Sequence, residues 1–184
     1  MKHILRFAFI SLSILLFQSV GYGQYDWMTF KADAVLSFSV DVPAEMEFET
    51  KEITTAIGKL TTQTYSLEGK EDDLNYLYLI NIVEYPLGTF PQDSIDLIDE
   101  YLLSSINSTV VKVKGKLVYT SDIDENKNGI GKLFRIKHNG DHLIIKGKSF
   151  IRKDAYISIQ VFTLRENSLN DEMNYFLDSF KSTF

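Results

Sequence analysis

The chain has 184 residues, 45% of them hydrophobic, and a formal net charge of −6. An acidic balance disfavours nucleic acid as a partner, because contacts to phosphates require a surplus of lysine and arginine. The sequence contains no cysteine, which excludes disulfide bridges, a lipid anchor on cysteine and a thiol nucleophile. One domain of this size can be held by its hydrophobic core alone, since a domain of about 150 residues buries roughly 70% of its unfolded surface.

Residues 1–23 have the pattern of a cleaved secretory signal peptide. Two basic residues precede an apolar and serine run, residues 7–17, and glycines stand at the two positions that signal peptidase reads. We expect cleavage before Gln24 and a periplasmic or secreted protein of a bacterial envelope. No second long apolar run follows, so we expect no membrane span after cleavage. The alternative is a buried N-terminal helix.

We expect residues 24–35 to form an entry segment and residues 36–184 to form a single domain. The domain opens with alternating apolar and polar residues over 36–42, 45–55 and 59–67, which predicts three strands. Residues 75–85 are apolar at both alternating sets of positions, so this strand must be covered on both faces. We therefore expect a central strand beneath helices.

The second half repeats the order of strands followed by a helix. A helix is predicted from Asp93 to about Asn107, and residues 110–120 are predicted to form a strand. Residues 129–164 form three strand-length blocks, the first two joined by Asn139-Gly140, which is typical of a hairpin with a two-residue turn. An amphipathic helix closes the chain after Ser168. The order predicts an α+β fold with a mainly antiparallel sheet.

Several segments resemble the PsbP-like fold family, which includes the photosystem II extrinsic subunit P and many exported bacterial proteins of unknown role. The resemblance covers about residues 27–184, and these features carry it: Trp27 and Phe30, the FSVDVP run at 38–43, Glu84-Tyr85-Pro86 at the end of the central strand, and FLDSFKSTF from Phe176. It implies an α/β/α sandwich around an antiparallel sheet, used for binding or assembly and not for catalysis. It supports the fold better than the function.

Two places invite a metal interpretation. The loop from Asp122 has oxygen-bearing residues on alternate positions, as a calcium loop does, but Arg135 stands where a bidentate glutamate should close the shell. The candidate ligands of this loop are Asp122, Asp124, Asn126 and Asn128. His138 and His142 flank the predicted turn, and a two-residue turn places them on opposite sides of the sheet. We expect no cofactor.

No catalytic constellation is evident, because the sequence lacks a thiol, a nucleophile elbow and a phosphate loop. We therefore expect no enzyme activity. The charge is uneven, however: residues 110–153 contain eleven basic and four acidic residues. A basic sheet face is predicted from lysines spaced two apart, Lys112, Lys114 and Lys116 on one strand and Lys146 and Lys148 on another. The simpler interpretation is that these lysines protect exposed strands from aggregation.

The sequence therefore predicts an exported, non-catalytic binding or accessory protein. We expect it to dock an envelope protein or an anionic partner through its sheet face or loops, and we expect a monomer. The alternative is a carrier that holds a small apolar or anionic ligand between sheet and helix, near Tyr76 and Tyr78. A carrier needs an enclosed apolar cavity, whereas a docking module has a filled core and an exposed patch.

Overall fold

A computed structural model of the chain describes residues 26–32, 36, 38–91, 93–123 and 130–182. Its elements in chain order are β1 (Met28–Lys31), β2 (Phe38–Val42), β3 (Glu47–Thr55), β4 (Gly58–Glu68), β5 (Asn75–Glu84), α2 (Ile95–Lys112), β6 (Lys116–Asp122), β7 (Ile130–His138), β8 (Leu143–Arg152), β9 (Ala155–Leu164), the 3-10 turn η1 (Arg165–Asn167), α3 (Asp171–Asp178) and β10 (Lys181–Ser182). The expected signal peptide and the calcium-like positions 124–129 lie outside the described residues.

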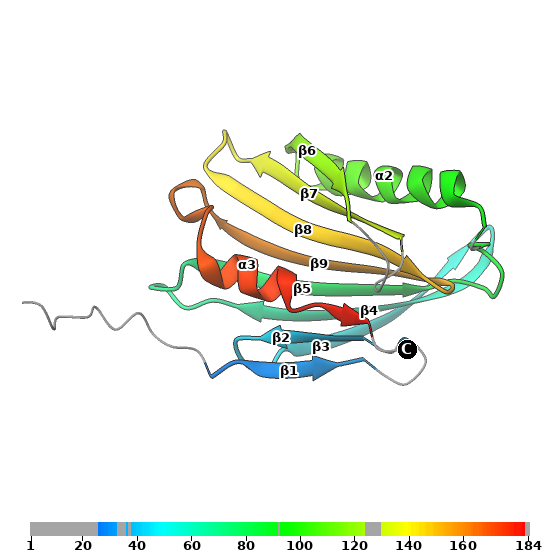
Figure 1. The fold of residues 1–184 in the computed structure, drawn as a ribbon, viewed down its shortest axis with the longest axis horizontal. Helices are drawn as coiled ribbons and strands as arrows, with labels where there is room; N and C mark the ends of the chain where they lie inside the picture. The colour runs from blue at the N-terminus through cyan, green and yellow to red at the C-terminus, as the bar shows by residue number, and fades with distance from the viewer. Residues whose placement is uncertain (1–25, 33–35, 37, 92, 124–129, 183–184) are drawn as a thin grey trace, which may run out of the picture.

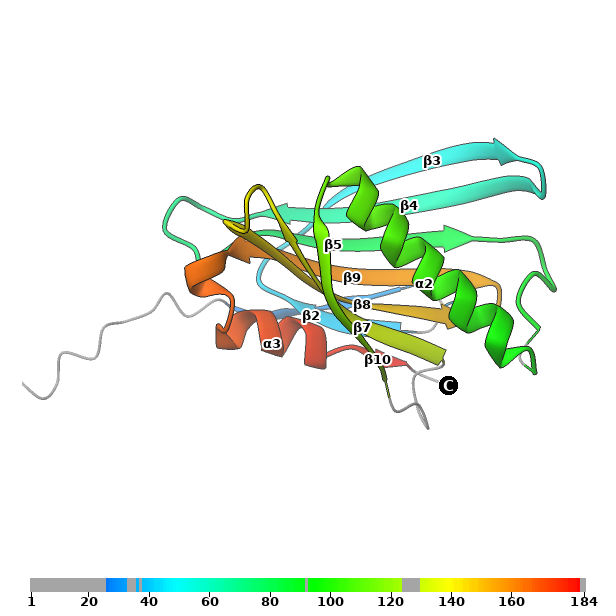
Figure 2. The same ribbon diagram turned by 90° about the horizontal axis from the view of Figure 1, so that it is seen from above.

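Seven strands form one antiparallel sheet in the order β3-β4-β5-β9-β8-β7-β6, and β1-β2-β10 form a second, smaller sheet (Figure 1). Helix α2 crosses one face of the large sheet diagonally, while α3 lies on the other face beside the small sheet (Figure 2). The predicted α+β fold, an α/β/α sandwich with a mainly antiparallel sheet, is confirmed. No helix in the described part of the chain is long and apolar enough to cross a membrane.

The main core lies between the large sheet, α3 and the small sheet. Alternate residues of β5 and β9 point into it, including Ile80 and Ile159, which are fully buried. From α3, Phe176 packs edge-on against Tyr78, with ring centroids 5.3 Å apart. The entry segment adds Trp27, which packs against Tyr175 at a centroid distance of 4.6 Å. This face of the sheet is therefore sealed by apolar contacts.

The opposite face is covered less completely, because α2 touches it through two separate apolar clusters. Ile98 and Leu102 pack with Phe90 and Tyr156 in the first cluster. Ile106, one turn further along α2, packs with side chains of β7 and β8 in the second. The expectation that β5 is covered on both faces therefore holds fully on the α3 side and partly on the α2 side.

The predicted strand over residues 110–120 is wrong at its start. Helix α2 continues to Lys112, Lys114 lies in a left-handed turn with φ 50°, and the strand begins only at Lys116. The three lysines therefore do not share one strand face. The helix continues because Val110 and Val113 complete the second apolar cluster under α2, and this packing outweighs the β preference of the valines.

Two finer expectations are also corrected. His138 pairs with Leu143, so the turn after β7 has four residues instead of two. Irregular pairing near Asn75 and Leu77 interrupts the alternation of β5, so Tyr76 packs against Phe162 and does not share a surface with Tyr78.

Helix α3 is attached to the sheet by a pair of amide side chains. Asn170 is the N-cap residue, and its Oδ1 accepts from the backbone N–H of Met173 at 2.7 Å. The same side chain donates through Nδ2 to Oδ1 of Asn75 at 2.9 Å, and Asn75 Nδ2 donates back at 3.1 Å. Asn75 is fully buried, so these bonds satisfy groups that would otherwise be costly to bury.

We expect Asn170→Ala to lower the free energy of unfolding by about 2–3 kcal/mol, because it removes a helix cap and takes the donor away from the buried Oδ1 of Asn75, whose Nδ2 keeps only its bond to the Tyr78 hydroxyl. Asn170→Ser keeps an acceptor for the cap and should lose less. Urea denaturation followed by circular dichroism measures both. Equal losses for the two variants would show that the amide pair and the cap do not contribute separately.

Glu172, in the first turn of α3, has one carboxylate oxygen that is buried without a hydrogen-bond partner among the described residues. Burial, followed by repulsion from Asp73, raises the pKa of Glu172 above its ordinary value. The folded protein therefore binds this proton more tightly than the unfolded chain does. The charged carboxylate consequently destabilises the fold above the raised pKa.

We expect Glu172→Gln to raise the melting temperature at pH 7, because it removes the charge that the fold disfavours. The gain should shrink as the pH falls through the raised pKa, since the native glutamate is then protonated. Thermal unfolding of both proteins at neutral and acidic pH measures this difference. A gain that is the same at both pH values would contradict the assignment.

Candidate functional site

A row of polar residues crosses the large sheet beneath α2. Strand pairing aligns one residue from each strand: Glu49, Thr64, Asn81, Ser158, Ser149, Lys132 and Asp122. Neighbours in this row bond to one another, as Thr64 donates to Asn81 Oδ1 at 3.0 Å and Ser149 to Ser158 at 3.3 Å. The row runs between the two apolar clusters that hold α2, so the helix spans a polar strip of the sheet.

Where α2 passes over β4, β5 and β9, this strip lines an open groove of about 450 Å³, here called the α2 groove. Its floor includes Thr64, Asn81, Ser158 and Gln160, and its helical wall includes Ser105 and Thr109. None of the residues lining it is aspartate, glutamate or histidine. A hollow without acidic groups is notable in a chain that carries a net charge of −6.

The groups around the α2 groove keep unused hydrogen-bonding capacity. Asn81 accepts from Thr64 through its oxygen, which leaves its amide N–H groups as donors. Gln160 donates through Nε2 to Ser158 at 2.9 Å, which leaves its oxygen as an acceptor. The Thr109 hydroxyl donates to the Ser105 carbonyl at 3.2 Å, so its oxygen can still accept. The groove can therefore both donate to a bound polar group and accept from it.

One end of the α2 groove is aromatic. Tyr101 of α2 and Tyr156 of β9 line it, with ring centroids 5.8 Å apart. The Tyr101 hydroxyl hydrogen-bonds to that of Tyr85. Burial raises the pKa of Tyr156, so the phenol stays neutral and provides an apolar ring with a polar edge.

The other end carries the only cation that lines the α2 groove. Lys112 is the last residue of α2, is exposed and has no carboxylate partner among the residues that the structure describes. It was predicted as part of a strand face and is instead placed at the mouth of the groove by the longer helix. Its ammonium group remains available for a negatively charged ligand.

The other predicted lysines do not join it. Lys146 donates to Asn174 Oδ1 and Lys148 pairs with Asp178 Oδ1, each at 2.8 Å, so both lie on the α3 side of the sheet. Burial, more than the neighbouring charges, lowers the pKa of Lys146. The predicted basic face is therefore divided between two sides of the molecule, and Lys112 alone reaches the α2 groove.

The metal candidates gain no support. Asp122 is described, and its carboxylate pairs with Lys132 at 2.6 Å, whereas Asp124, Asn126 and Asn128 fall outside the described residues. Within the described ranges, no group of three or more histidines and acids is arranged to hold a metal ion.

The buried charged residue of the polar row is Lys132, whose side chain is 7% exposed. Its ammonium group pairs with Asp122 of β6 and with Asp99 of α2, which links the helix to the sheet. Burial disfavours the charged amine, but hydrogen bonds with the two carboxylates outweigh burial and raise the pKa of Lys132. We assign this triad a structural role.

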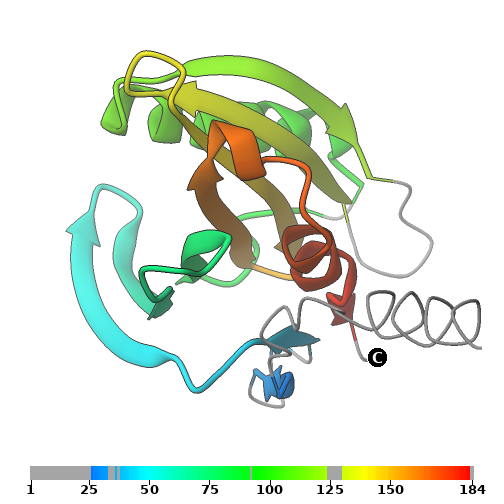
Figure 3. The same cartoon turned by 90° about the vertical axis from the view of Figure 1, so that its left-hand side faces the viewer.

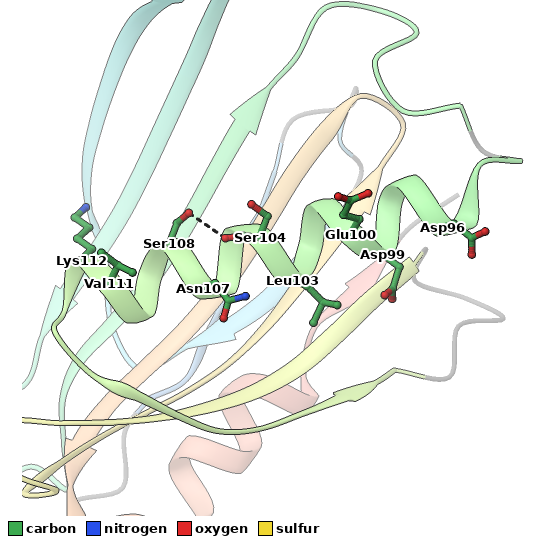
Figure 4. Close-up of a pocket in the computed structure, with 9 residues that line it drawn as sticks. All are labelled: Asp96, Asp99, Glu100, Leu103, Ser104, Asn107, Ser108, Val111 and Lys112. Carbon is green, nitrogen blue, oxygen red and sulfur yellow. Dashed lines mark hydrogen bonds between the residues drawn. The ribbon is translucent and has the colours of Figure 1, made fainter.

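A second hollow, of about 770 Å³, runs along the outer side of α2 (Figure 4). Its lining comes from this one helix, with Asp96, Asp99 and Glu100 near the N-terminal end and Lys112 at the other. A depression bounded by one exposed helix side and rich in acidic groups is a solvated surface. It lacks the enclosure and converging polar groups of the α2 groove.

The sequence matches no protein-family model and no curated protein. Solved structures do match. The chain is similar to the solution structure of cyanobacterial PsbP (CyanoP) from Synechocystis sp. PCC 6803, with a TM-score of 0.54 and 11% identity over 89% of this chain and 96% of that chain. A Pseudomonas aeruginosa protein of unknown function matches with a TM-score of 0.36 and 9% identity over 77% of this chain and 85% of its own.

The likeness to cyanobacterial PsbP supports an α+β sandwich of the PsbP-like type, as the sequence resemblance implied. At 11% identity the likeness to cyanobacterial PsbP establishes the fold alone.

The α2 groove was missed from the sequence, although a signal was present. Asn81, Ser158 and Gln160 interrupt runs that are otherwise apolar. Such residues mark a polar strip on a covered sheet face, but only the pairing of β5 with β9 shows that Asn81 and Ser158 are neighbours.

We expect the double change Asp99→Asn with Asp122→Asn to lower the free energy of unfolding by about 2 kcal/mol, because it leaves the buried Lys132 amine without a carboxylate. Lys132→Met should cost about 1 kcal/mol or less, since it removes the charge and keeps the packing. Chemical denaturation of the two variants compares them. If Lys132→Met lost more stability than the double variant, the attraction within the ion pairs would exceed the free-energy cost of burying the Lys132 charge.

Proposed function

We propose that this chain is an exported, non-catalytic binding protein of the bacterial envelope, periplasmic or secreted, that holds an anionic, hydroxyl-bearing group in the α2 groove. The observation that carries the proposal is the composition of the groove: donors, acceptors and one free lysine, with no acidic side chain. The leader-like residues 1–23 support export.

The shape of the molecule supports binding over carriage of an apolar ligand. Apolar side chains fill the space between the sheet and α3. Tyr78, which the carrier alternative places near its ligand, is only 1% exposed. The α2 groove lies between sheet and helix, as a carrier site would, but its lining is hydroxyl- and amide-rich. Tyr101 and Tyr156 offer ring faces and edges of the kind that contact the C–H surface of a polyol.

The lining also supports a non-catalytic role. Histidine, carboxylates and thiols are the usual general acids, bases and nucleophiles near neutral pH, and none of them lines the α2 groove. Burial raises the pKa of Tyr156 and keeps its phenol neutral, and the lysine lies at the mouth. Such a lining orients and retains a ligand without activating it.

Gluconate, which combines a carboxylate with a chain of hydroxyls, is a suitable probe, and sorbitol is its uncharged counterpart. The chain is expressed from Met1 in a bacterial host and purified in the form that the host produces. We expect gluconate to shift the amide signals of β5, β9 and α2 in heteronuclear NMR spectra, with a weaker response to sorbitol.

Lys112→Gln should weaken gluconate binding about tenfold and leave the response to sorbitol unchanged. Lys59→Gln, a matched change on an exposed lysine that does not line the groove, should leave both unchanged. Gluconate shifts located elsewhere, or equal in the Lys112 and Lys59 variants, would contradict the proposal.

A further inference from the structure

Strand β3 is an edge strand that is exposed on both of its faces. It pairs only with β4 within the described chain, and every residue from Glu47 to Thr54 is exposed. Together with β4 it forms a long hairpin at the margin of the sheet (Figure 3). Two large apolar side chains stand open on it, Phe48 at 56% and Ile53 at 47% exposure. The outer edge can accept another strand through its free backbone groups.

The charges of β3 determine which strand it can accept. Glu47, Glu49 and Lys51 lie on one face, and Glu52 lies on the other. Suppose that a second copy of β3 pairs antiparallel with the first about a two-fold axis. Residues that lie opposite each other across the two strands then have side chains on the same side of the sheet. The register is defined by the residue that lies on the two-fold axis.

Most registers oppose like charges. An axis at Glu49, Lys51 or Glu52 places that residue against its own copy. An axis at Ile53 joins only residues 51–55 and pairs no opposite charges. An axis at Thr50 joins residues 47–53 of both copies, sets Glu49 opposite Lys51 twice, and places Glu47 and Glu52 opposite uncharged residues.

We propose that the chain self-associates by pairing β3 with β3 of a second copy in the register centred on Thr50. The two sheets then continue into one, and Glu49 and Lys51, already 2.7 Å apart within each copy, form a closed set of four alternating charges. Phe48 and Ile53 lie against the aliphatic parts of Glu52 and Glu47 of the second copy. This differs from the monomer expected from the sequence and is independent of the function proposed for the α2 groove.

Charged residues on an edge strand commonly prevent pairing. On β3 they do so for the registers that oppose like charges, and the register centred on Thr50 is the one that turns them into attraction. The pattern therefore specifies a particular pairing as well as blocking others.

Charge reversal tests the register. By sedimentation velocity at increasing protein concentration, we expect a dimer of the wild-type chain. Glu49→Lys and Lys51→Glu, made singly, should each weaken it about tenfold or more, because each places like charges opposite one another twice. The double variant Glu49→Lys with Lys51→Glu restores opposite charges and should return the dimer. Glu71→Lys and Lys70→Glu, on an exposed loop, are matched controls and should leave the dimer intact.

A single introduced thiol tests the geometry, since the chain has no cysteine of its own. Thr50→Cys places two thiols across the axis, with Cβ atoms about 5 Å apart, within reach of a short bis-maleimide cross-linker. Thr54→Cys lies on the same face of β3 and is also exposed, but its two copies are about 27 Å apart in this register at about 3.4 Å per residue. We expect the first variant to cross-link and the second not to.

Four results of these two experiments would overturn the proposal. They are a wild-type chain that stays monomeric at every concentration, a double variant no better than the single ones, a dimer that survives both single reversals, and equal cross-linking of the two cysteine variants. A strand of another protein captured on β3 in place of a second copy would equally refute it.

Discussion

The antiparallel register of β5, β9 and β8 is the constraint on which the rest of the structure depends. Because side chains alternate along a strand, Ile157 and Ile159 of β9 enter the main core while Ser158 and Gln160 face α2. A slip of one residue would exchange these two sets. The same pairing therefore fills one side of the sheet with apolar side chains and lays a polar strip across the other.

Helix α2 rests on this second side without covering it completely. Its two apolar clusters lie on either side of the polar row, and Lys132 adds an ionic link to Asp99. Because α2 is fixed on both sides of the polar row, it holds the helical wall of the α2 groove at a constant distance from the sheet residues that form the floor. Sites of this kind are formed before a ligand arrives, which limits the entropy lost on binding.

Local pattern was enough to predict most of the fold. Alternation identified β2, β3, β4 and the meander β7–β9, and the double apolar face of residues 75–85 identified a central strand. Local pattern failed where tertiary packing determines the secondary structure. Lysines spaced two apart favoured a strand, but Val110 and Val113 fill the second apolar cluster and extend the helix to Lys112. The groove could not be predicted, because its floor joins residues distant in sequence whose register only the folded sheet determines.

The small sheet has a consequence for the order in which the fold can close. β2 lies between β1, near the start of the described chain, and β10, near its end, and Phe38 of β2 packs in a tilted arrangement against Phe180 with ring centroids 5.2 Å apart. The main core therefore lacks a wall until α3 packs on it and β10 pairs with β2. The earlier strands alone therefore cannot enclose this interior, and removal of residues 171–182 would leave the Phe38 ring of β2 in water.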